Sequence, residues 1–400
     1  YKSVFKMSLL LAYVIDEKGG LICENQKKRI LEKNPESKWP DPYLLMFERV
    51  LDFFHKRGNE KTVDLLRKCM YLKLESKVLR SDYQSKKIDA KKAKVINYIN
   101  HWKWNHDNVQ ELNKFDEWSF KKNVQFGMLI NNFLISAYRE LSDMVKTKGS
   151  EIKISQNDLT VLGRKIYVIY SKQQGKFNCI SQFSDKDPHQ DNLTLLRTSQ
   201  HGQNEIFNVY MDNVTNLILK KSDVKEYFLH SSKSALGTLP WIILNKCYGP
   251  KTRLNIMNYQ YGEDVNSLLE DLFSFFPPID ISKIDSQKLL HSAVKEKVYI
   301  VINFSIPRWS KEVKTVGIIS RNNWGEMFFQ EYSGKEGLNK AVDALKGGKF
   351  ELLREVKGFY KVYIPKGESY TALLNQINNT LKKHVSFHFG AQCFYKHSAR

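Results

Sequence analysis

The hydrophobic pattern of the chain changes near Gly149, and this change predicts two halves of different architecture. Over residues 1–148 the apolar residues recur at the spacing of amphipathic helices. After Gly149, short runs rich in β-branched and aromatic residues alternate with shorter helical runs. We therefore expect an α+β protein in which an all-helical domain (1–148) is followed by a mixed α+β domain (150–400).

The helices of the first half have clear local signals. The stretch "DPYLLMFERVLDFFHKRG" (41–58) offers Asp41 as N-cap, Pro42 at the first helical position and Gly58 as a stop. Two further helices are predicted over 60–80 and 116–149. The expected buried stripe of the 60–80 helix consists of Leu65, Cys69 and Leu72.

The second half is predicted to begin with a helix capped by Ser155 and to continue as strands and helices. The predicted strands are 176–181, 193–199, 206–213, 252–259, 297–305, 315–320, 326–333 and 359–365. The predicted helices are 155–172, 234–248, 263–276, 335–348 and 369–384. No internal repeat is visible in the sequence.

Bulk properties limit the class of protein only loosely. The net charge of +20 favours anionic partners, but the lysines are spread along the chain. Five scattered cysteines without a CxxC pair indicate a reducing compartment and hence a cytoplasmic protein. No stretch is long and apolar enough for a membrane span. Because the chain begins at Tyr1 and has no signal pattern, we expect it to be a fragment of a longer protein.

Carboxylates that could bind two metal ions are not recognisable in the sequence, so no catalytic residue is predicted. A nucleotidyl transfer needs paired acids on a strand. Asp158 follows a Gly-Ser pair but has Thr160 where the second acid should stand, and Asp185 and Asp187 lie in a polar loop. The histidines and the cysteine near the C-terminus fit no zinc spacing. These residues are His384, His388, Cys393 and His397.

Basic helix faces are the remaining candidates for a nucleotide site. Lys2 and Lys6 stand four residues apart on one helical face, and Arg67 and Tyr71 do the same in the 60–80 helix, away from its expected stripe. Lysine and arginine serve triphosphates well. The alternative is an ordinary solvated basic face.

The segment "SRNNWGEMFFQEYSG" (320–334) is richer in polar residues than a simple hairpin requires. Asn322 and Asn323 suit a turn, and Gly325 relieves the backbone there. Trp324 needs burial and a partner for its N–H. We expect a structural hairpin that fixes a domain contact, with Arg321 and Glu326 as an ion pair across it. The alternative is a direct contact of this hairpin with a ligand.

Four blocks resemble successive blocks of the bacterial class I adenylate cyclases, in the order and at the spacing of that family. They are "YKSVFKMSLLLAY", "DPYLLMFERVLDFF", "DLLRKCMYLKLESK" and "DLTVLGRKIY". The stretch "RNNWGE" (321–326) resembles the family's Arg-Asn-x-Trp-Asn-Glu signature, with Gly325 in place of its second Asn. The resemblance covers most of the chain, patchily over 80–115 and after 335. After Glu326 the charged residues of the signature are replaced by apolar ones.

The resemblance implies a part of an enzyme that makes cyclic AMP and pyrophosphate from ATP. The Mg²⁺-binding acids of that family lie upstream of these blocks, so the chain alone is expected to be inactive. The nucleotide contacts implied for it are Lys2, Lys6, Arg67, Tyr71 and Lys73. The family also implies regulation by a phosphocarrier of the sugar phosphotransferase system.

Two rival interpretations remain open. One is a basic nucleic-acid-binding module, although no RRM, KH or helix-turn-helix signature is present, so nucleic acid is not the expected partner. The other is a degenerate cyclase homologue that acts only as an interaction scaffold, which the altered segment "EMFFQEYSG" suggests.

Overall fold

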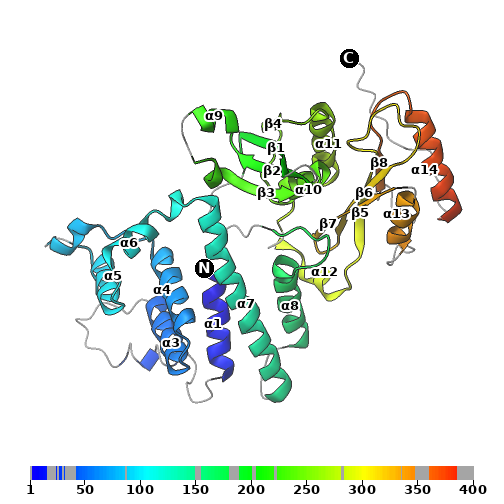
Figure 1. Ribbon diagram of the computed structural model, residues 1–400. Helices are drawn as coiled ribbons and strands as arrows, with labels where there is room; N and C mark the ends of the chain where they lie inside the picture. Colours follow the sequence, from blue (N-terminus) through cyan, green and yellow to red (C-terminus); the bar gives the residue numbers. More distant parts are fainter. Residues whose placement is uncertain are drawn as a thin grey trace. The chain divides into compact units, whose positions relative to one another are not determined.

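The chain forms two compact units in the computed structural model (Figure 1). The first unit comprises Tyr1–Leu159 and Ser181–Asp185, and the second comprises Thr160–Ile180 and Lys186–Arg400. The residues that the structure describes are 2–15, 24, 27–28, 31, 42–85, 88–148, 155–179, 189–200, 204–219, 223–280, 283–334, 336–346 and 360–384. Within these ranges the first unit is helical and the second mixes helices and sheets, so the α+β prediction is confirmed.

The first unit is a group of helices around an apolar centre. Its helices are α1 (Lys2–Ile15), α3 (Pro42–Lys56), α4 (Glu60–Leu74), α5 (Ala90–His101), α6 (His106–Asn113) and α7 (Phe120–Lys148), with 3₁₀ turns η1 (Arg80–Gln84) and η2 (Phe115–Glu117). Helix α1 packs against α3, α4 and α7. Gly58 has a φ of +66° just after α3, as a helix stop requires. The expected cap Asp41 lies outside the described residues.

Helix α4 buries more of its circumference than the predicted stripe. Leu65 and Cys69 are buried, but Leu72 is only half-buried. Met70 and Tyr71 are buried as well. The stripe was predicted too narrow because α4 touches α1, α3, α6 and α7, which lie on more than one side of it.

The second unit contains the same strand arrangement twice. One sheet has the order β3-β2-β1-β4 and the other β7-β6-β5-β8. In each, an antiparallel three-stranded meander is followed by a helix and by a strand parallel to the first. The strands are β1 (Asn192–Gln200), β2 (Asn204–Met211), β3 (Phe228–Ser232), β4 (Arg253–Met257), β5 (Lys295–Ile302), β6 (Thr315–Asn322), β7 (Met327–Ser333) and β8 (Tyr360–Tyr363).

Each sheet is completed by two helices at equivalent points of the chain. The helices of the first sheet are α10 (Ala235–Leu244) and α11 (Gly262–Phe275), and those of the second are α13 (Gly337–Lys346) and α14 (Tyr370–His384). The short helices α9 (Val214–Leu219), η4 (Val224–Tyr227) and α12 (Ser286–Leu290) lie in connections, and α8 (Gln156–Tyr170) precedes the sheets. Within the second unit, each sheet with its two helices is thus a copy of the same arrangement, a structural duplication that the sequence pattern did not reveal.

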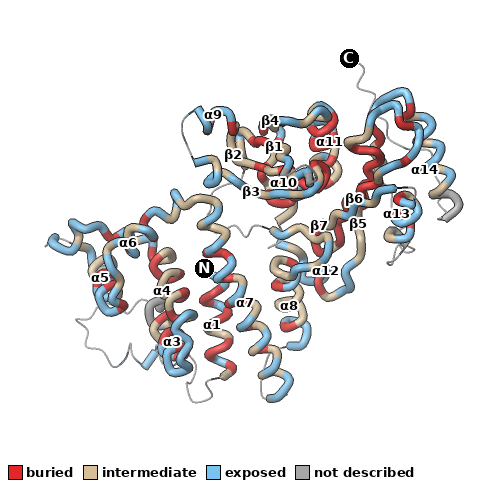
Figure 2. Tube along the Cα trace, viewed as in Figure 1, coloured by how far each residue is buried: buried red, intermediate tan, exposed pale blue. Residues whose placement is uncertain are grey.

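Helices α10 and α11 lie between the two sheets (Figure 1). Every residue of α10 is buried, as Figure 2 shows along its length. A helix that is apolar on all sides must be covered on all sides. The contacts of two glycines confirm this: a Cβ on Gly237 of α10 would approach Phe329 of β7, and a Cβ on Gly317 of β6 would approach Leu236 of α10.

The remaining two helices cover the other face of the second sheet. Val298, Ile300 and Ile318 of the sheet form one apolar cluster with Val342 of α13 and Leu373 of α14. Because β5 and β6 are covered on both faces, their sequences read as continuous apolar runs instead of alternating ones.

One strand prediction needs correction, and one strand was not predicted. The predicted strand 176–181 is not formed over the residues that the structure describes there (176–179). In that range only Lys176 makes a β-bridge, and its partner is Phe328. Strand β3 was not predicted, because its sequence "FLHSS" is short and half polar. The other predicted strands and the five predicted helices of this half are confirmed within the described residues.

The cysteines that the structure describes are free thiols with raised pKa values. Burial raises the pKa of Cys69 and Cys247 to about 12 and that of Cys179 to about 11, so these free thiols are unreactive.

Among the described residues, no helix combines the length and the apolar character that a membrane crossing requires.

His230 of β3 makes the stability of the second unit pH-dependent. Its ring stacks on Trp241 with a centroid distance of 4.5 Å, and burial lowers its pKa from 6.5 to about 4. The unfolded chain therefore binds the proton first as the pH falls. We expect the stabilisation to be complete above pH 6.5 and to be lost between there and about 4, with roughly 2 kcal/mol gone by pH 5.

Urea unfolding of the wild type and of His230→Phe at pH 7.5 and pH 5 measures this effect. The phenylalanine keeps a flat ring against Trp241 but cannot bind a proton. The difference between the two pH values should shrink by roughly 2 kcal/mol in the variant. An unchanged difference would mean that other groups cause the pH dependence.

Candidate functional site

The RNNWGE stretch forms the turn of the β6–β7 hairpin, as predicted. Asn322 organises it: its Oδ1 accepts the backbone N–H groups of Trp324 (3.1 Å) and Glu326 (2.9 Å). Its Nδ2 donates to Glu326 Oε2 at 2.7 Å. Gly325 closes the turn with a φ of +79°. One amide side chain thus uses both of its ends inside the turn.

Trp324 fastens the turn to neighbouring helices. The side chain is 8% exposed and packs with Val168 of α8 and Leu289 of α12. Its indole Nε1–H donates to the Lys288 carbonyl at 3.1 Å, and the Arg164 guanidinium lies over the ring at 5.2 Å. The predicted need for burial and an N–H partner is confirmed.

Glu326 forms a buried ion pair with Lys176, a residue that the sequence did not single out. Their Nζ and Oε1 atoms are 2.7 Å apart, and each side chain is 2% exposed. Lys176 Nζ also donates to the Val168 carbonyl (2.7 Å), to the Tyr167 carbonyl (3.2 Å) and to Ser171 Oγ (2.9 Å). The lysine therefore satisfies the last carbonyls of α8 as well as the carboxylate.

The chain after α8 lies against β7 and places Lys176 there. Phe177 N donates to the Met327 carbonyl at 2.9 Å, and Phe329 N donates to the Gly175 carbonyl at 2.7 Å. A Cβ on Gly175 would lie 2.7 Å from the Phe329 carbonyl oxygen, so the backbones can meet only at a glycine.

The predicted ion pair between Arg321 and Glu326 is wrong. Arg321 is 7% exposed and donates to the Pro277 carbonyl at 2.8 Å, with its guanidinium 5.7 Å from the Phe276 ring centroid. Burial lowers its pKa below the ordinary value. Successive strand residues point to opposite faces, and Asn322 takes the face of Glu326, so Arg321 is directed to the other.

This buried cluster, consisting of Lys176, Asn322, Trp324 and Glu326, is suited to holding segments together. Its charges and amides bond to one another and to backbone carbonyls, and they are almost fully covered. A satisfied buried polar network fixes one arrangement of the chain around it. The geometry therefore gives the signature stretch a structural role.

Replacing Gly325 tests whether the backbone conformation of the turn requires glycine, and the asparagine of the family signature is one of the replacements. Its φ of +79° disfavours a side chain, and a Cβ would lie 2.4 Å from Ile279 Cδ1, the movable end of a side chain. We expect Gly325→Ala to lower the free energy of unfolding by about 1–2 kcal/mol. Gly325→Asn should cost less, since asparagine tolerates this conformation.

Thermal unfolding of both variants measures this order. Equal losses would show that the contact with Ile279, and not the backbone conformation, sets the cost.

The five predicted nucleotide contacts lie in the first unit in two different settings. Lys2 and Lys6 of α1 are exposed and share one helical face. Lys73 of α4 is half-buried with its Nζ 5.7 Å from the Phe5 ring centroid of α1.

Arg67 and Tyr71 are built into the packing of α4. Arg67 bonds to His55 Nε2 at 3.1 Å and lies 6.0 Å from the ring of Trp102. Tyr71 is 3% exposed; its hydroxyl donates to Asn113 Oδ1 (2.6 Å) and accepts the Val78 N–H (3.1 Å). Burial raises the pKa of this phenol. The expected exposed face for Tyr71 is therefore wrong, because α4 packs on several sides.

The carboxylates that the sequence analysis considered as metal ligands do not form a metal site within the described residues. Asp158 lies in the first turn of α8 and bonds to the cap residue Ser155. Ser155 Oγ accepts the Asp158 backbone N–H (3.0 Å) and donates to Asp158 Oδ2 (2.6 Å). Asp185 and Asp187 lie outside the described residues. In the part of the chain that the structure describes, no group of three or more His, Cys, Asp or Glu could hold a metal ion.

Comparison with known families finds a similarity in the first part of the chain. Residues 1–181 match the family "Adenylate cyclase, class-I, second domain". This region contains the helices of the first unit and α8, and its last residue comes five positions after Lys176 in the sequence. Residues 1–181 are thus similar to the second domain of the class I adenylate cyclases.

Curated relatives extend the similarity to most of the chain. Adenylate cyclase of Haemophilus influenzae is 23% identical over an alignment of 329 residues that covers 80% of this chain and 38% of the relative. The Pasteurella multocida enzyme is 22% identical over 86% of the chain and 44% of its own length. The Escherichia coli enzyme is 20% identical over 87% and 43%. The chain thus spans about 40% of the length of these relatives. No solved structure matches.

Proposed function

We propose that this chain is part of a class I adenylate cyclase that converts ATP into cyclic AMP and pyrophosphate. The observation that carries the proposal is the second-domain match over residues 1–181, together with adenylate cyclase relatives that align with at least 80% of the chain. The relatives are more than twice as long as the chain. We further propose that the Mg²⁺-binding acids belong to the upstream part of the full protein and that the protein is cytoplasmic.

Within this enzyme, the chain would contribute to the triphosphate side of the nucleotide site. Of the five candidate contacts, Lys2 and Lys6 fit this role best, because they are exposed and four residues apart on α1. An ammonium group acts on a phosphate as a point charge and needs no fixed plane. Arg67, Tyr71 and Lys73 would act behind them by holding α4 in place.

The second unit would carry regulation. Its duplicated sheets lie beyond the matched second domain, and the cluster around Glu326 joins the end of that domain to the β6–β7 hairpin. A phosphocarrier protein of the sugar phosphotransferase system is the regulator that we propose for it.

Kinetics of a reconstituted enzyme test the nucleotide role. The chain is co-expressed with the part of the Haemophilus influenzae enzyme that it does not match, and cyclic AMP formation is measured against ATP concentration. Lys2→Gln with Lys6→Gln should raise KM for ATP roughly tenfold, the loss of two exposed charge contacts. Lys121→Gln, an exposed lysine on α7, is the matched control. Equal effects of both changes would remove α1 from the site.

A further inference from the structure

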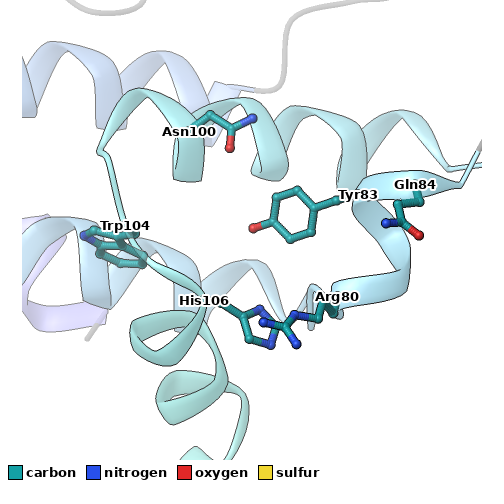
Figure 3. Close-up of a pocket in the computed structure, with 6 residues that line it drawn as sticks. All are labelled: Arg80, Tyr83, Gln84, Asn100, Trp104 and His106. Carbon is teal, nitrogen blue, oxygen red and sulfur yellow. The ribbon is translucent and has the colours of Figure 1, made fainter.

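A pocket of about 300 Å³ lies in the first unit beside α5 and α6 (Figure 3). Its walls are η1, the end of α5, the turn that follows and the first residue of α6. Six residues line it: Arg80, Tyr83, Gln84, Asn100, Trp104 and His106. None of the five proposed nucleotide contacts is among these six residues, although one of them, Tyr71, packs behind the lining residue Trp104.

The lining combines positive charge, aromatic rings and amides. Arg80 is a permanent cation with several N–H donors, and His106 can donate a further N–H. Tyr83 and Trp104 offer rings, and no carboxylate is among the six lining residues. Figure 3 shows the Tyr83 ring extending into the space between the other side chains. Arginine binds phosphate and aromatic rings stack on bases, so this set suits a ligand with both features.

The walls of the pocket are held in place from outside. Asp82 of η1 accepts the Leu79 N–H at 2.7 Å and pairs with Lys92 at 2.9 Å. These two bonds hold the pKa of Asp82 below its ordinary value. Trp104 packs against Trp102, with ring centroids 4.9 Å apart, and against Tyr71 at 6.0 Å. A preformed pocket loses little free energy to ordering when it binds.

We propose that this pocket binds a nucleoside monophosphate. The phosphate would lie at Arg80 and His106, and the base would lie against Tyr83 and Trp104 with its edge toward Asn100 and Gln84. One arginine and one histidine suit a single phosphate better than a triphosphate. The volume is at the low end of the roughly 300–1,000 Å³ typical of ligand pockets, which also favours a small nucleotide.

The site is independent of the catalytic reaction and requires no metal. Only the choice of adenine as the tested base rests on the proposed function. A 5′-monophosphate and a 3′,5′-cyclic monophosphate share the required chemistry, and the experiment distinguishes them.

Isothermal titration calorimetry of chain 1–400 with AMP, cyclic AMP, adenosine and inorganic phosphate tests the proposal. We expect one of the two nucleotides to bind at least about tenfold more tightly than adenosine or phosphate, because both parts of the ligand contribute. Failure of both nucleotides to bind at millimolar concentration would overturn the site. So would adenosine binding as tightly as the nucleotides.

Variants then locate the binding. Arg80→Gln should weaken nucleotide binding roughly tenfold or more, and Tyr83→Leu by a similar factor. Arg139→Gln, an exposed arginine on α7, removes the same charge and should leave binding unchanged. Equal losses for Arg80→Gln and Arg139→Gln would mean general attraction to a basic chain. Loss on changing Lys2 and Lys6 instead would place the ligand at α1 and also overturn the proposal. Because binding is the readout, failure here leaves the proposed cyclase function untouched.

Discussion

Lys176→Met should lower the free energy of unfolding by about 3–5 kcal/mol, because it leaves the Glu326 carboxylate buried without its cation. The two side chains are 2% exposed and their charged atoms are 2.7 Å apart. The same change also removes donors from the carbonyls at the end of α8. Urea unfolding of chain 1–400, followed by circular dichroism, measures the loss.

Two further variants show whether burial is the cause. Lys340→Met removes an exposed lysine of α13 that pairs with Glu336, and it should cost no more than about 0.5 kcal/mol. Lys176→Met combined with Glu326→Leu removes both buried charges and should regain at least half of the stability lost by the single change. A loss at Lys176 no larger than that at Lys340 would contradict the buried cluster.

Trp324→Ala should lower the free energy of unfolding by about 3–5 kcal/mol through the cavity it leaves between α8, α12 and the hairpin. It also leaves the Lys288 carbonyl without its indole donor. Trp324→Phe keeps part of the apolar contact and should cost less.

The chain supplies a control of the same residue type. Trp309 is 69% exposed, whereas Trp324 is 8% exposed. Trp309→Ala should change the free energy of unfolding by no more than about 0.5 kcal/mol. If Trp324→Ala, like Trp309→Ala, unfolds at the same urea concentration as the wild type, Trp324 does not anchor the hairpin.

The structure gives a physical reason for the apolar residues that follow the signature. Phe329 of β7 stacks near Phe177, with ring centroids 6.3 Å apart, and lies against Gly237 of α10. Met327 is buried. In this chain the segment covers α10 and pairs with residues 175–177, so apolar side chains are needed there.

Elements whose ends or turns are determined by a few neighbouring residues could be predicted from the sequence. Helix α3 ends where Gly58 predicts, the Ser155 cap begins α8, and the turn at Asn322 and Gly325 forms as its residues require. These features depend on neighbours within a few residues.

Features that depend on distant contacts were not predictable. Lys176 is 150 positions from Glu326, and a lysine between Gly175 and Phe177 carries no sign of burial. Tyr71 has helical spacing that fits an exposed face, but its hydroxyl meets Asn113 of α6. The duplication is visible only in the order of hydrogen-bonded strands, since the two halves do not share a sequence pattern.

The proposed assignment to an adenylate cyclase is tested most directly by cyclic AMP formation in vitro. Purified chain 1–400 is incubated with Mg-ATP alone and after mixing with the part of the Haemophilus influenzae enzyme that it does not match. We predict no cyclic AMP from the chain alone and formation of cyclic AMP in the mixture, at a level above that of the complementary part by itself. Cyclic AMP made by the chain alone, or a mixture no more active than the complementary part, would contradict this account.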